Sequence, residues 1–513
     1  MKKIYLALLV ATVATTGTTY AQSYAPDAYR FSQMNYGSTS RFKAMGNAQI
    51  GVGGDIGSLG ANPAGLGLFT KSEFSLTPEF NNVQNTSDFL NQNTNGTKGQ
   101  LNLNNIGAVF YSPNYKTKGT DVNTGLVSAV FGLGYNRNND FLNNIDYQGT
   151  NNLNSIRDAF VDQANDNGTS NSVAGDAFNS HLINNNTTQY PNQYSAEPYT
   201  GVNPFNQNYT ESRLGSTSEF NVAGALNFGN KLYVGATVSF VNVRYVSEAS
   251  FQESGKLQDL QPGEDGTATT LPGGSILVHP IENYSLNYTR NQDTKGSGVN
   301  IKLGMIYRPV SEFRVGVTFQ SPTWMTVQDN VDEGVNSIIT NDKSNNNLQN
   351  YYFSYRLRTP LKASAGASYV IGGRALISAD IDYVDYASMR FSQDNGSDIS
   401  TINSSNRDVK DFYKETINYR FGAEVKVSNE VSLRAGYGIN GSGVKNGKDK
   451  FFQTQAISGG LGYRIDNYYF DLTYQNLTSN FYSSAYELND GSETLASVKN
   501  QRNNVFLTFG VRF

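Results

Sequence analysis

The strongest constraint on this chain is an alternation of apolar and polar residues with a period of two. In residues 417–427, INYRFGAEVKV, every odd position is apolar or aromatic, whereas the even positions hold Asn, Arg, Gly, Glu and Lys. Successive side chains of a β-strand point to opposite faces, so the pattern predicts a strand between an apolar and a polar environment. The same pattern recurs at residues 299–307, 361–369, 431–437 and 470–474.

The composition of the two faces favours a transmembrane β-barrel over a soluble β-sandwich. No apolar run beyond the N-terminus approaches the roughly 18 residues of a helical membrane span. A sandwich also alternates, but its polar face meets water and carries Lys, Glu and Thr freely. Here the polar positions are rich in Gly and Ser with isolated charges, as expected inside a closed barrel. Aromatic residues gather near strand ends, as at residues 351–353 and 468–469, where an interfacial girdle would lie.

Residues 1–21 are predicted to be a signal peptide, because two lysines precede an apolar stretch at residues 4–13 and a small-residue cleavage site ends at Ala21. Its removal takes two of the 39 basic residues and none of the 43 acidic ones, so the net charge moves from -4 to about -6. A surface that follows nucleic-acid phosphates needs a basic excess, so nucleic acid is excluded as a partner. The chain has no Cys and therefore no disulfide framework.

Short links alternate with long polar loops, which is the asymmetry of outer-membrane barrels. The short links lie at residues 229–230, 309–311, 372–373, 428–429 and 466–467. Fourteen antiparallel strands fit between them, with both ends of the barrel on the periplasmic side. We expect these strands at residues 72–83, 101–113, 124–140, 213–229, 231–252, 288–308, 312–321, 350–371, 374–392, 411–427, 430–440, 450–466, 468–484 and 497–513. The long extracellular loops are predicted at residues 141–212, 253–287 and 322–349, with short helical pieces near 156–164 and 173–183.

The last strand gives independent support for this class. Residues 505–513, VFLTFGVRF, alternate up to the final carboxylate and end on an aromatic residue, Phe513. Many bacterial outer-membrane barrels end in this way, and we interpret Phe513 as part of the signal that the barrel assembly machinery reads. The expected location is therefore the outer membrane of a Gram-negative bacterium, in contact with outer-membrane lipid and lipopolysaccharide.

Residues 22–71 precede the first strand, are rich in Gly and lack alternation. The lumen of a fourteen-stranded barrel is wider than its own side chains can fill, so this segment is predicted to fold into the bore as a hatch, or plug. The expected organisation is a signal peptide at 1–21, a hatch at 22–71 and a transmembrane barrel at 72–513.

Several motifs resemble the FadL/TodX family of outer-membrane transporters of hydrophobic compounds. Asn62-Pro63-Ala64-Gly65, together with residues 31–33, 44–48 and 53–55, resembles the family's N-terminal hatch. Residues 298–308, 355–360 and 376–386 are similar to its Bacteroidetes-type branch. The resemblance spans nearly the whole mature chain, and the family barrel also has fourteen strands.

The resemblance implies passive transport of hydrophobic small molecules such as long-chain fatty acids, by a monomer without a cofactor. Outer loops capture the ligand, a pocket in the lumen binds it, and it leaves sideways through an opening beside a kinked third strand. In this chain Gly132 and Gly134 of the expected third strand are the candidates for that kink and lateral opening. Ordinary glycines facing the lumen are the alternative interpretation.

Two other functions stay open at this stage. A haem receptor would need an axial ligand, and the two histidines, His181 and His279, fall in predicted loops without a local motif. A surface adhesin or receptor would use the long outer loops. An enzyme is not expected, because no nucleophile elbow, His-Glu-x-x-His pattern or paired-carboxylate motif occurs. No metal site is expected either, since residues 394–398 lack the full spacing of a calcium loop and suit a turn.

Overall fold

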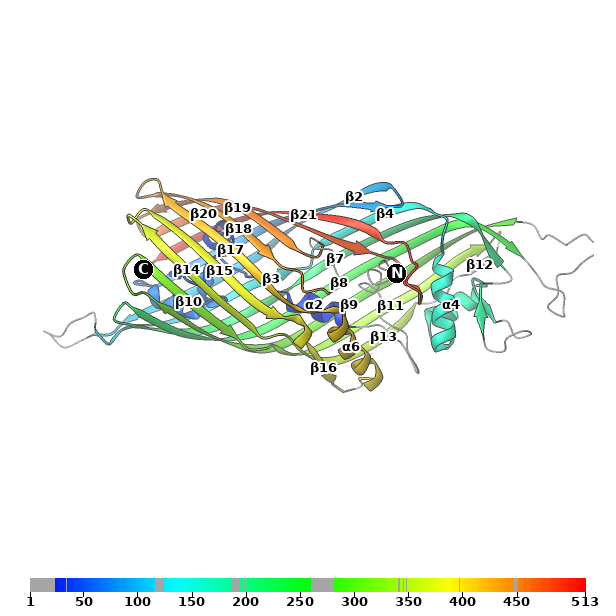
Figure 1. Cartoon of the computed structure of the whole chain (residues 1–513), viewed down its shortest axis with the longest axis horizontal. Coiled ribbons are helices and arrows are strands. Elements are labelled where there is room, and N and C mark those ends of the chain that lie inside the picture. Colours follow the sequence, from blue (N-terminus) through cyan, green and yellow to red (C-terminus); the bar gives the residue numbers. More distant parts are fainter. Residues whose placement is uncertain are drawn as a thin grey trace, which may run out of the picture.

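A computed structural model describes the chain from Tyr24 to the C-terminus with short gaps. The described residues are 24–33, 35–115, 124–185, 193–196, 199–259, 281–339, 342–344, 346, 348–395, 397–445 and 451–513. The predicted signal peptide lies outside them. The strands form one closed antiparallel barrel of 14 strands, as the sequence predicted (Figure 1). The ring closes because β1 pairs with β2 on one side and with β21, the last strand, on the other.

Several wall strands are interrupted and continue as a second segment. In chain order the wall consists of β1 (Glu73–Phe89), β2 (Gln92–Pro113), β3 (Leu126–Asp140) continued by β4 (Asn143–Asn151), β7 (Tyr199–Phe228), β8 (Leu232–Asp259), β9 (Ile281–Tyr307), β10 (Phe313–Gln320) continued by β11 (Trp324–Ile339), β13 (Gln349–Arg358) continued by β14 (Lys362–Ile371), β15 (Ala375–Asp385) continued by β16 (Arg390–Gln393), β17 (Glu415–Lys426), β18 (Val431–Asn440), β19 (Thr454–Ile465), β20 (Tyr468–Ser483) and β21 (Ala496–Arg512). The five predicted short links join strands at one end of the barrel, the turn end, and most of the longer connections lie at the other, the loop end (Figure 1).

The predicted long loops differ from the structure. Most of 322–349 is strand β11, the segment 141–212 begins with β4 and ends in β7, and β8 and β9 extend into 253–287 from both sides. Residues 84–100 also form strand, because β1 and β2 meet in a tight hairpin at Leu90 and Asn91. These strand extensions carry Asn, Ser, Thr and Gln on their exposed face, so the apolar alternation that reveals a strand in lipid is absent.

The remaining elements cover the loop end. They are α4 (Ile156–Asn167), α5 (Val173–Asn179), β5 (Asn184–Asn185), β6 (Tyr194–Ser195), β12 (Asp342–Ser344), η3 (Tyr386–Ser388) and α6 (Ile399–Phe412). The first two confirm the predicted helical pieces. The sequence reasoning missed α6, whose N-cap is Asp398. Although burial alone would raise the pKa of this carboxyl, hydrogen bonds from Ser400 and Thr401 hold the pKa at about 2.

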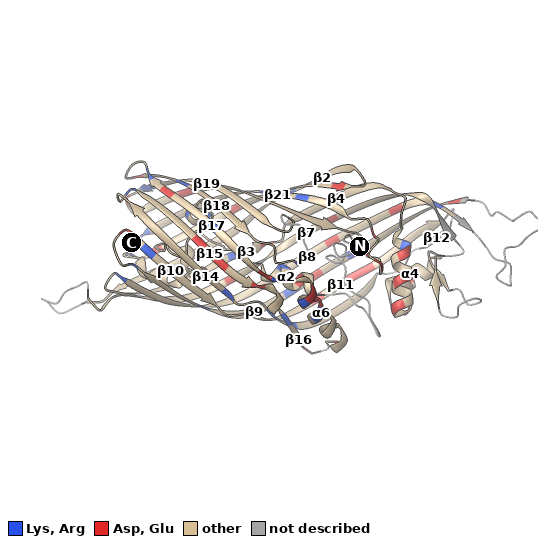
Figure 2. Ribbon diagram, in the orientation of Figure 1, with Lys and Arg blue, Asp and Glu red and all other residues tan. Residues whose placement is uncertain are grey.

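Exposed apolar side chains surround the turn half of the barrel. Examples are Phe110, Leu226, Phe240, Leu303, Phe421, Leu472 and Leu507. Charged positions are scattered over the strands (Figure 2), and many of them lie on the lumen side in ion pairs. No helix in the described ranges is both long and apolar enough to span a membrane. Within these ranges, no group of three or more His, Cys, Asp or Glu side chains is placed to hold a metal ion.

The segment between Tyr24 and β1 folds inside the barrel, where Figure 1 shows it as dark-blue turns enclosed by the wall. It consists of α2 (Ala25–Ser32), α3 (Ser40–Ala44), η1 (Ile56–Leu59) and η2 (Pro63–Leu68). We call residues 24–71 the hatch. Its hydrogen bonds reach separate strands, because Asp380 of β15 accepts the N–H groups of Gln49 and Ile50 at 2.6 and 2.9 Å. On β17, Glu424 accepts Nε of Arg41 at 2.8 Å.

Wall glycines allow the hatch backbone to pack against the lumen surface. A Cβ atom on Gly436 would lie 2.0 Å from the backbone nitrogen of Gly46, and one on Gly316 would lie 2.1 Å from the carbonyl oxygen of Ile50. No side chain fits at these distances. The Gly-rich polar face of the strands is therefore the surface against which the hatch packs.

We expect Asp380→Ala to loosen the hatch, because two buried N–H groups lose their acceptor at a cost of roughly 1–3 kcal/mol. In planar bilayers the variant should show frequent channel openings where the parent protein stays closed. The matched control is Asp385→Ala on the same strand, whose carboxylate accepts, among the described residues, the N–H of Ala387 alone. Equal conductance of the two variants would contradict the anchoring role of Asp380.

Candidate functional site

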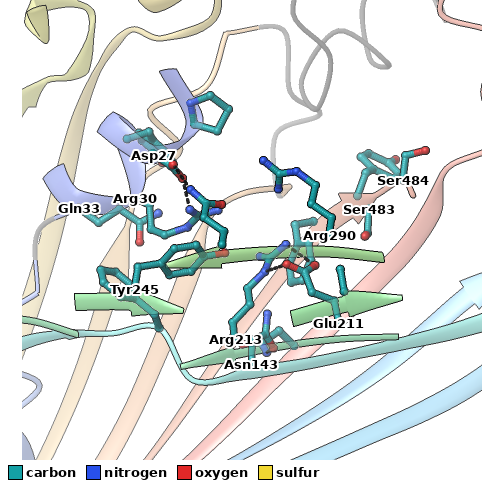
Figure 3. A pocket seen from close by; sticks show the side chains of 18 of the residues that line it. Asp27, Arg30, Gln33, Asn143, Glu211, Arg213, Tyr245, Arg290, Ser483 and Ser484 are labelled. Carbon is teal, nitrogen blue, oxygen red and sulfur yellow. Dashed lines mark hydrogen bonds and ion pairs between the residues drawn. The ribbon is translucent and has the colours of Figure 1, made fainter. Parts of the chain in front are cut away.

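A cavity of about 800 Å³ lies between the hatch, the loop half of the wall and helices α4 and α5. This volume lies within the usual range of small-molecule sites. Its lining combines aromatic rings with charged groups, among them Tyr24, Tyr29, Phe141, Tyr245, Tyr288 and Tyr413, and Asp27, Arg30, Arg137, Glu211, Arg213 and Arg290. Figure 3 shows hatch side chains on one side of the cavity and wall side chains facing them.

Most charges in the cavity are neutralised by a neighbour. Glu211 and Arg213 are two residues apart on β7, so their side chains share one face of the strand. The Arg213 guanidinium donates Nε and Nη2 to the Glu211 carboxylate at 2.6 and 2.7 Å (Figure 3). Arg290 of β9 donates Nε at 2.8 Å to Glu333, which stands directly opposite on β11. Arg30 of the hatch pairs with Asp27 one turn away. Paired groups present less net charge to a ligand than isolated ones.

Aromatic rings supply the apolar part of the lining. Tyr24 stacks on Phe353 with ring centroids 4.6 Å apart, and Tyr29 stacks on Tyr413 at 4.8 Å. The Tyr245 ring lies 4.1 Å below the Arg30 guanidinium. Such rings offer large, rigid apolar surface at low entropic cost to a bound ligand.

Two cations of the lining are not in ion pairs within the described part of the chain. The Lys43 ammonium donates to the carbonyl oxygen of Tyr36 at 2.7 Å and lies 5.1 Å from the centroid of the Phe506 ring. Arg502 of β21 donates to the carbonyl oxygen of Asp140 at 2.8 Å and to Asn500 at 3.3 Å. Both lie on the cavity surface, so they keep capacity for an anionic group.

The hydrogen-bonded wall is interrupted on one side of the cavity. The β2–β3 ladder ends at the pair Asn105–Asn136, and β4, which continues β3, pairs with β7. Residues 92–104 of β2 therefore pair with β1 alone among the described strands. We call this stretch the seam. Side chains bridge it, since Lys98 donates to Ser212 and Asn85 donates to Asn143.

A bulge in β3 marks the start of the seam. The β3–β7 register shifts between Arg137 and Asn139, so Asn138 is an extra residue without a partner. The bulge reaches the hatch, because Asn138 accepts the N–H of Gly37 at 3.2 Å and Asn139 donates to the carbonyl oxygen of Arg30 at 3.1 Å. At this bulge, β3 stops pairing with β2 and forms hydrogen bonds with the hatch instead.

Residues that line the cavity flank the seam on both sides, since Glu79 of β1 stands opposite Asn102 of β2, and Asp140 ends β3. Glu79, Asp140 and Phe141 line the cavity beside it. On the outside of the same stretch of β2, Leu101 and Leu103 are 74% and 39% exposed. Cavity-lining residues and exposed apolar side chains therefore lie on opposite faces of the wall beside the seam.

The predicted hatch motif lies away from the cavity. Asn62 caps η2, because its Oδ1 accepts the N–H of Ala64 at 3.1 Å, and its Nδ2 donates to the carbonyl oxygen of Ile50 at 2.7 Å. Pro63, Ala64 and Gly65 form the first turn of η2 against β8 and β9. The observed contacts of the motif stabilise the fold of the hatch and its packing against the wall.

The two predicted kink glycines occupy regular ladder positions. Gly132 stands opposite Val109 and Gly134 opposite Gly107. Both face the hatch, where an added Cβ would meet Leu59 at 2.8 and 2.7 Å. The irregularity lies four residues beyond Gly134, at Asn138, in a polar run that gives no sequence signal for a bulge.

The other predicted residues lie far from the lining. Phe513 follows β21, where its N–H donates to the carbonyl oxygen of Ser72 at 3.0 Å. His181 is exposed after α5 and is not part of the cavity surface. His279 lies outside the described residues. The residues at 394–398 serve the fold, since Asp394 accepts from Ser354 and Asp398 caps α6.

The crystal structure of a Pseudomonas aeruginosa FadL homologue is similar to this chain, with a TM-score of 0.50, 12% sequence identity and coverage of 93% of this chain and 99% of that one. The toluene transporter TodX of P. putida matches with a TM-score of 0.49, 12% identity and coverage of 93% and 98%. No protein-family model and no curated protein matches the chain in sequence. At this identity the likeness to the FadL homologue establishes the fold, and the function rests on the site.

We expect Gly134→Val to destabilise the protein by roughly 1–3 kcal/mol, because the new side chain overpacks against Leu59. The measurement is the temperature at which the folded band is lost in gel electrophoresis of the detergent-folded protein. Gly224→Val is the control, since that glycine is exposed and a Cβ there meets no atom closer than 3.9 Å. If both variants lose the folded band at the same temperature, the close packing of Gly134 against the hatch does not contribute to stability.

Proposed function

We propose that this protein is a passive conduit for hydrophobic small molecules across the outer membrane. A ligand enters at the loop end, binds in the cavity above the hatch and leaves through the seam into the bilayer. One observation carries this proposal: the β2–β3 ladder stops at the pair Asn105–Asn136, next to residues that line the cavity, and Leu101 and Leu103 are exposed on the outside of the unpaired stretch.

Sideways exit follows from the cost of moving apolar groups through water. Each CH₂ transferred into water costs about 0.8 kcal/mol, so a long alkyl chain gains little from an open aqueous pore. The hatch closes the lumen toward the turn end by contacts with several strands. The seam then offers a route from an aromatic cavity to lipid without an aqueous step, and no energy source is needed.

The membrane placement is part of the same proposal. The turn end faces the periplasm and the loop end faces the exterior, and the exposed apolar side chains contact lipid. The barrel acts as a monomer beside outer-membrane lipid and lipopolysaccharide, and the assembly machinery recognises its final strand and Phe513. Residues 22–71 act as the hatch of a FadL/TodX-type transporter, for which the similar fold of the P. aeruginosa FadL homologue gives support. The assignment to the Bacteroidetes branch rests on the sequence motifs at residues 298–308, 355–360 and 376–386.

Long-chain fatty acids are the ligand class that we favour. Lys43 and Arg502 can receive a carboxylate, and the neighbouring rings can cover an alkyl chain. Among the described residues, no histidine lies on the cavity surface, so the geometry gives no specific support to a haem receptor.

Deletion of Asn138 tests the exit route. Without this extra residue β3 can stay in register with β7 and continue its ladder with β2, which closes the seam. We expect uptake of a fluorescent long-chain fatty acid by cells to fall to the level of a strain lacking the protein, whereas binding to the purified variant persists. Asn138→Ala keeps the bulge, loses the side-chain hydrogen bonds to Gly37 and Glu219 and should transport normally. Unchanged uptake by the deletion variant would rule out exit at the seam.

Lys43→Met tests the recognition of the head group. A charged hydrogen bond contributes about 1.5–3 kcal/mol, so the affinity for a fluorescent fatty acid should fall roughly tenfold or more. The affinity for the fatty alcohol of equal length should change little, because it has no charge to lose. Equal losses for acid and alcohol would show that Lys43 supports the cavity without selecting an anion.

A further inference from the structure

A second hollow lies on the outside of the wall, at the loop end. It has a volume of about 650 Å³ and runs across β4, β7, β8, β9 and β11. We call it the outer groove. It faces away from the lumen, because its exposed side chains alternate with buried ones such as Tyr209 and Phe251 that point inward. It is therefore separate from the transport cavity.

The floor of the outer groove consists of two rows of side chains that stand opposite one another from strand to strand. The first row is Gln148, Asn208, Gln252, Asn287 and Asn336, and the second is Thr150, Asn206, Ser254, Ser285 and Ile338. Each member is the direct register partner of the next. The rows thus cross five strands without a break.

The two rows contain amides and hydroxyls, one Ile and no charge. An exposed protein surface usually carries roughly a quarter to a third charged residues, so a charge-free floor of this width is not an ordinary solvated face. Lys343, on β12, stands at one edge. The lack of cations on the floor argues against an anionic ligand, and a single apolar side chain, Ile338, is too little apolar surface for a lipid tail.

Several amides of the floor are free to bind a ligand. The side chains of Gln148, Asn208 and Gln252 have no hydrogen-bond partner within the described ranges. Each amide offers two donor hydrogens and one acceptor oxygen. Sugar hydroxyls also donate and accept, so rows of amides at regular strand spacing can match a chain of sugar units.

The position of the groove agrees with such a ligand. On the same outward face of β8, Phe240 belongs to the apolar belt, and Gln252 lies twelve residues further along the strand. At about 3.3 Å per residue this is roughly 40 Å along the strand, beyond the apolar belt. In an outer membrane, the sugar chains of glycolipids surround a barrel beyond its apolar belt.

From the register, the lack of charge and the height, we propose that the outer groove binds an uncharged polysaccharide chain. This site goes beyond the proposed transport and rests only on the outer-membrane placement of the barrel. It would hold the barrel among the glycans that surround its extended strands. The ligand is either the polysaccharide of a membrane glycolipid or a free polysaccharide, since both present the same hydroxyl groups.

The test measures, by interferometry, the binding of two polysaccharides to the immobilised full-length mature protein in detergent. One probe is the lipid-free polysaccharide that mild acid releases from the glycolipid of the native host, and the other is dextran. We expect saturable binding of the first, and binding of dextran as well if the site accepts free neutral polysaccharides in general. Asn208→Ala/Gln252→Ala/Asn287→Ala should weaken binding at least tenfold.

The matched control is Asn242→Ala/Asn291→Ala, which removes outward-facing amides from β8 and β9 nearer the belt and outside the groove. The control should bind like the parent protein. Fatty-acid binding and gel mobility of the folded band should be the same in all variants, so that failure of this site is separable from failure of transport. Absence of saturable binding, or equal losses in both variants, overturns the proposal. A dimer that the triple variant dissociates overturns it too, because the groove would then join two copies.

Discussion

The closed ladder of backbone hydrogen bonds is the constraint on which the rest of this structure depends. In hydrocarbon an unpaired N–H or C=O group costs several kcal/mol, so a wall of strands must close on itself. The pairing of β1 with β21 over residues 73–88 and 497–512 accomplishes this closure. A break in such a ladder requires local compensation. At the seam the compensation comes from polar side chains, as in the contacts of Lys98 with Ser212 and of Asn85 with Asn143.

The hatch and the seam are physically connected. At the bulge, Asn138 and Asn139 form hydrogen bonds with Gly37 and Arg30 of the hatch, so the hatch supports the strand that leaves the ladder. The wall in turn seats the hatch through close glycine contacts and the Asp380 and Glu424 anchors. One segment therefore lies in the lumen and contacts the strand that leaves the ladder. The paired charges of the cavity leave aromatic rings and polar groups together on its surface.

The sequence predicted the strands whose outer face contacts lipid and missed the strand extensions whose outer face is polar. Alternation at residues 417–427 and in the final strand reports two different environments, so strand number and closure could be predicted. Strand β11 and the end of β8 beyond Gln252 are largely polar on their exposed face and gave no such signal. The bulge could not be predicted, because Asn138 lies among similar polar residues and its effect arises from register with β7. Likewise, Lys43 became a candidate only when folding placed it on the cavity surface without a carboxylate partner.

The most direct test of the account compares two fluxes through the mature protein in liposomes. One is the arrival of a membrane-soluble fluorescent hydrophobe in the bilayer from an external carrier, and the other is sugar-driven swelling of the same vesicles. The account predicts faster transfer of the hydrophobe and no faster swelling than in protein-free vesicles, because the hatch closes the lumen and the seam opens to lipid. Sugar permeation without accelerated transfer of the hydrophobe would contradict it and would make the barrel an aqueous pore.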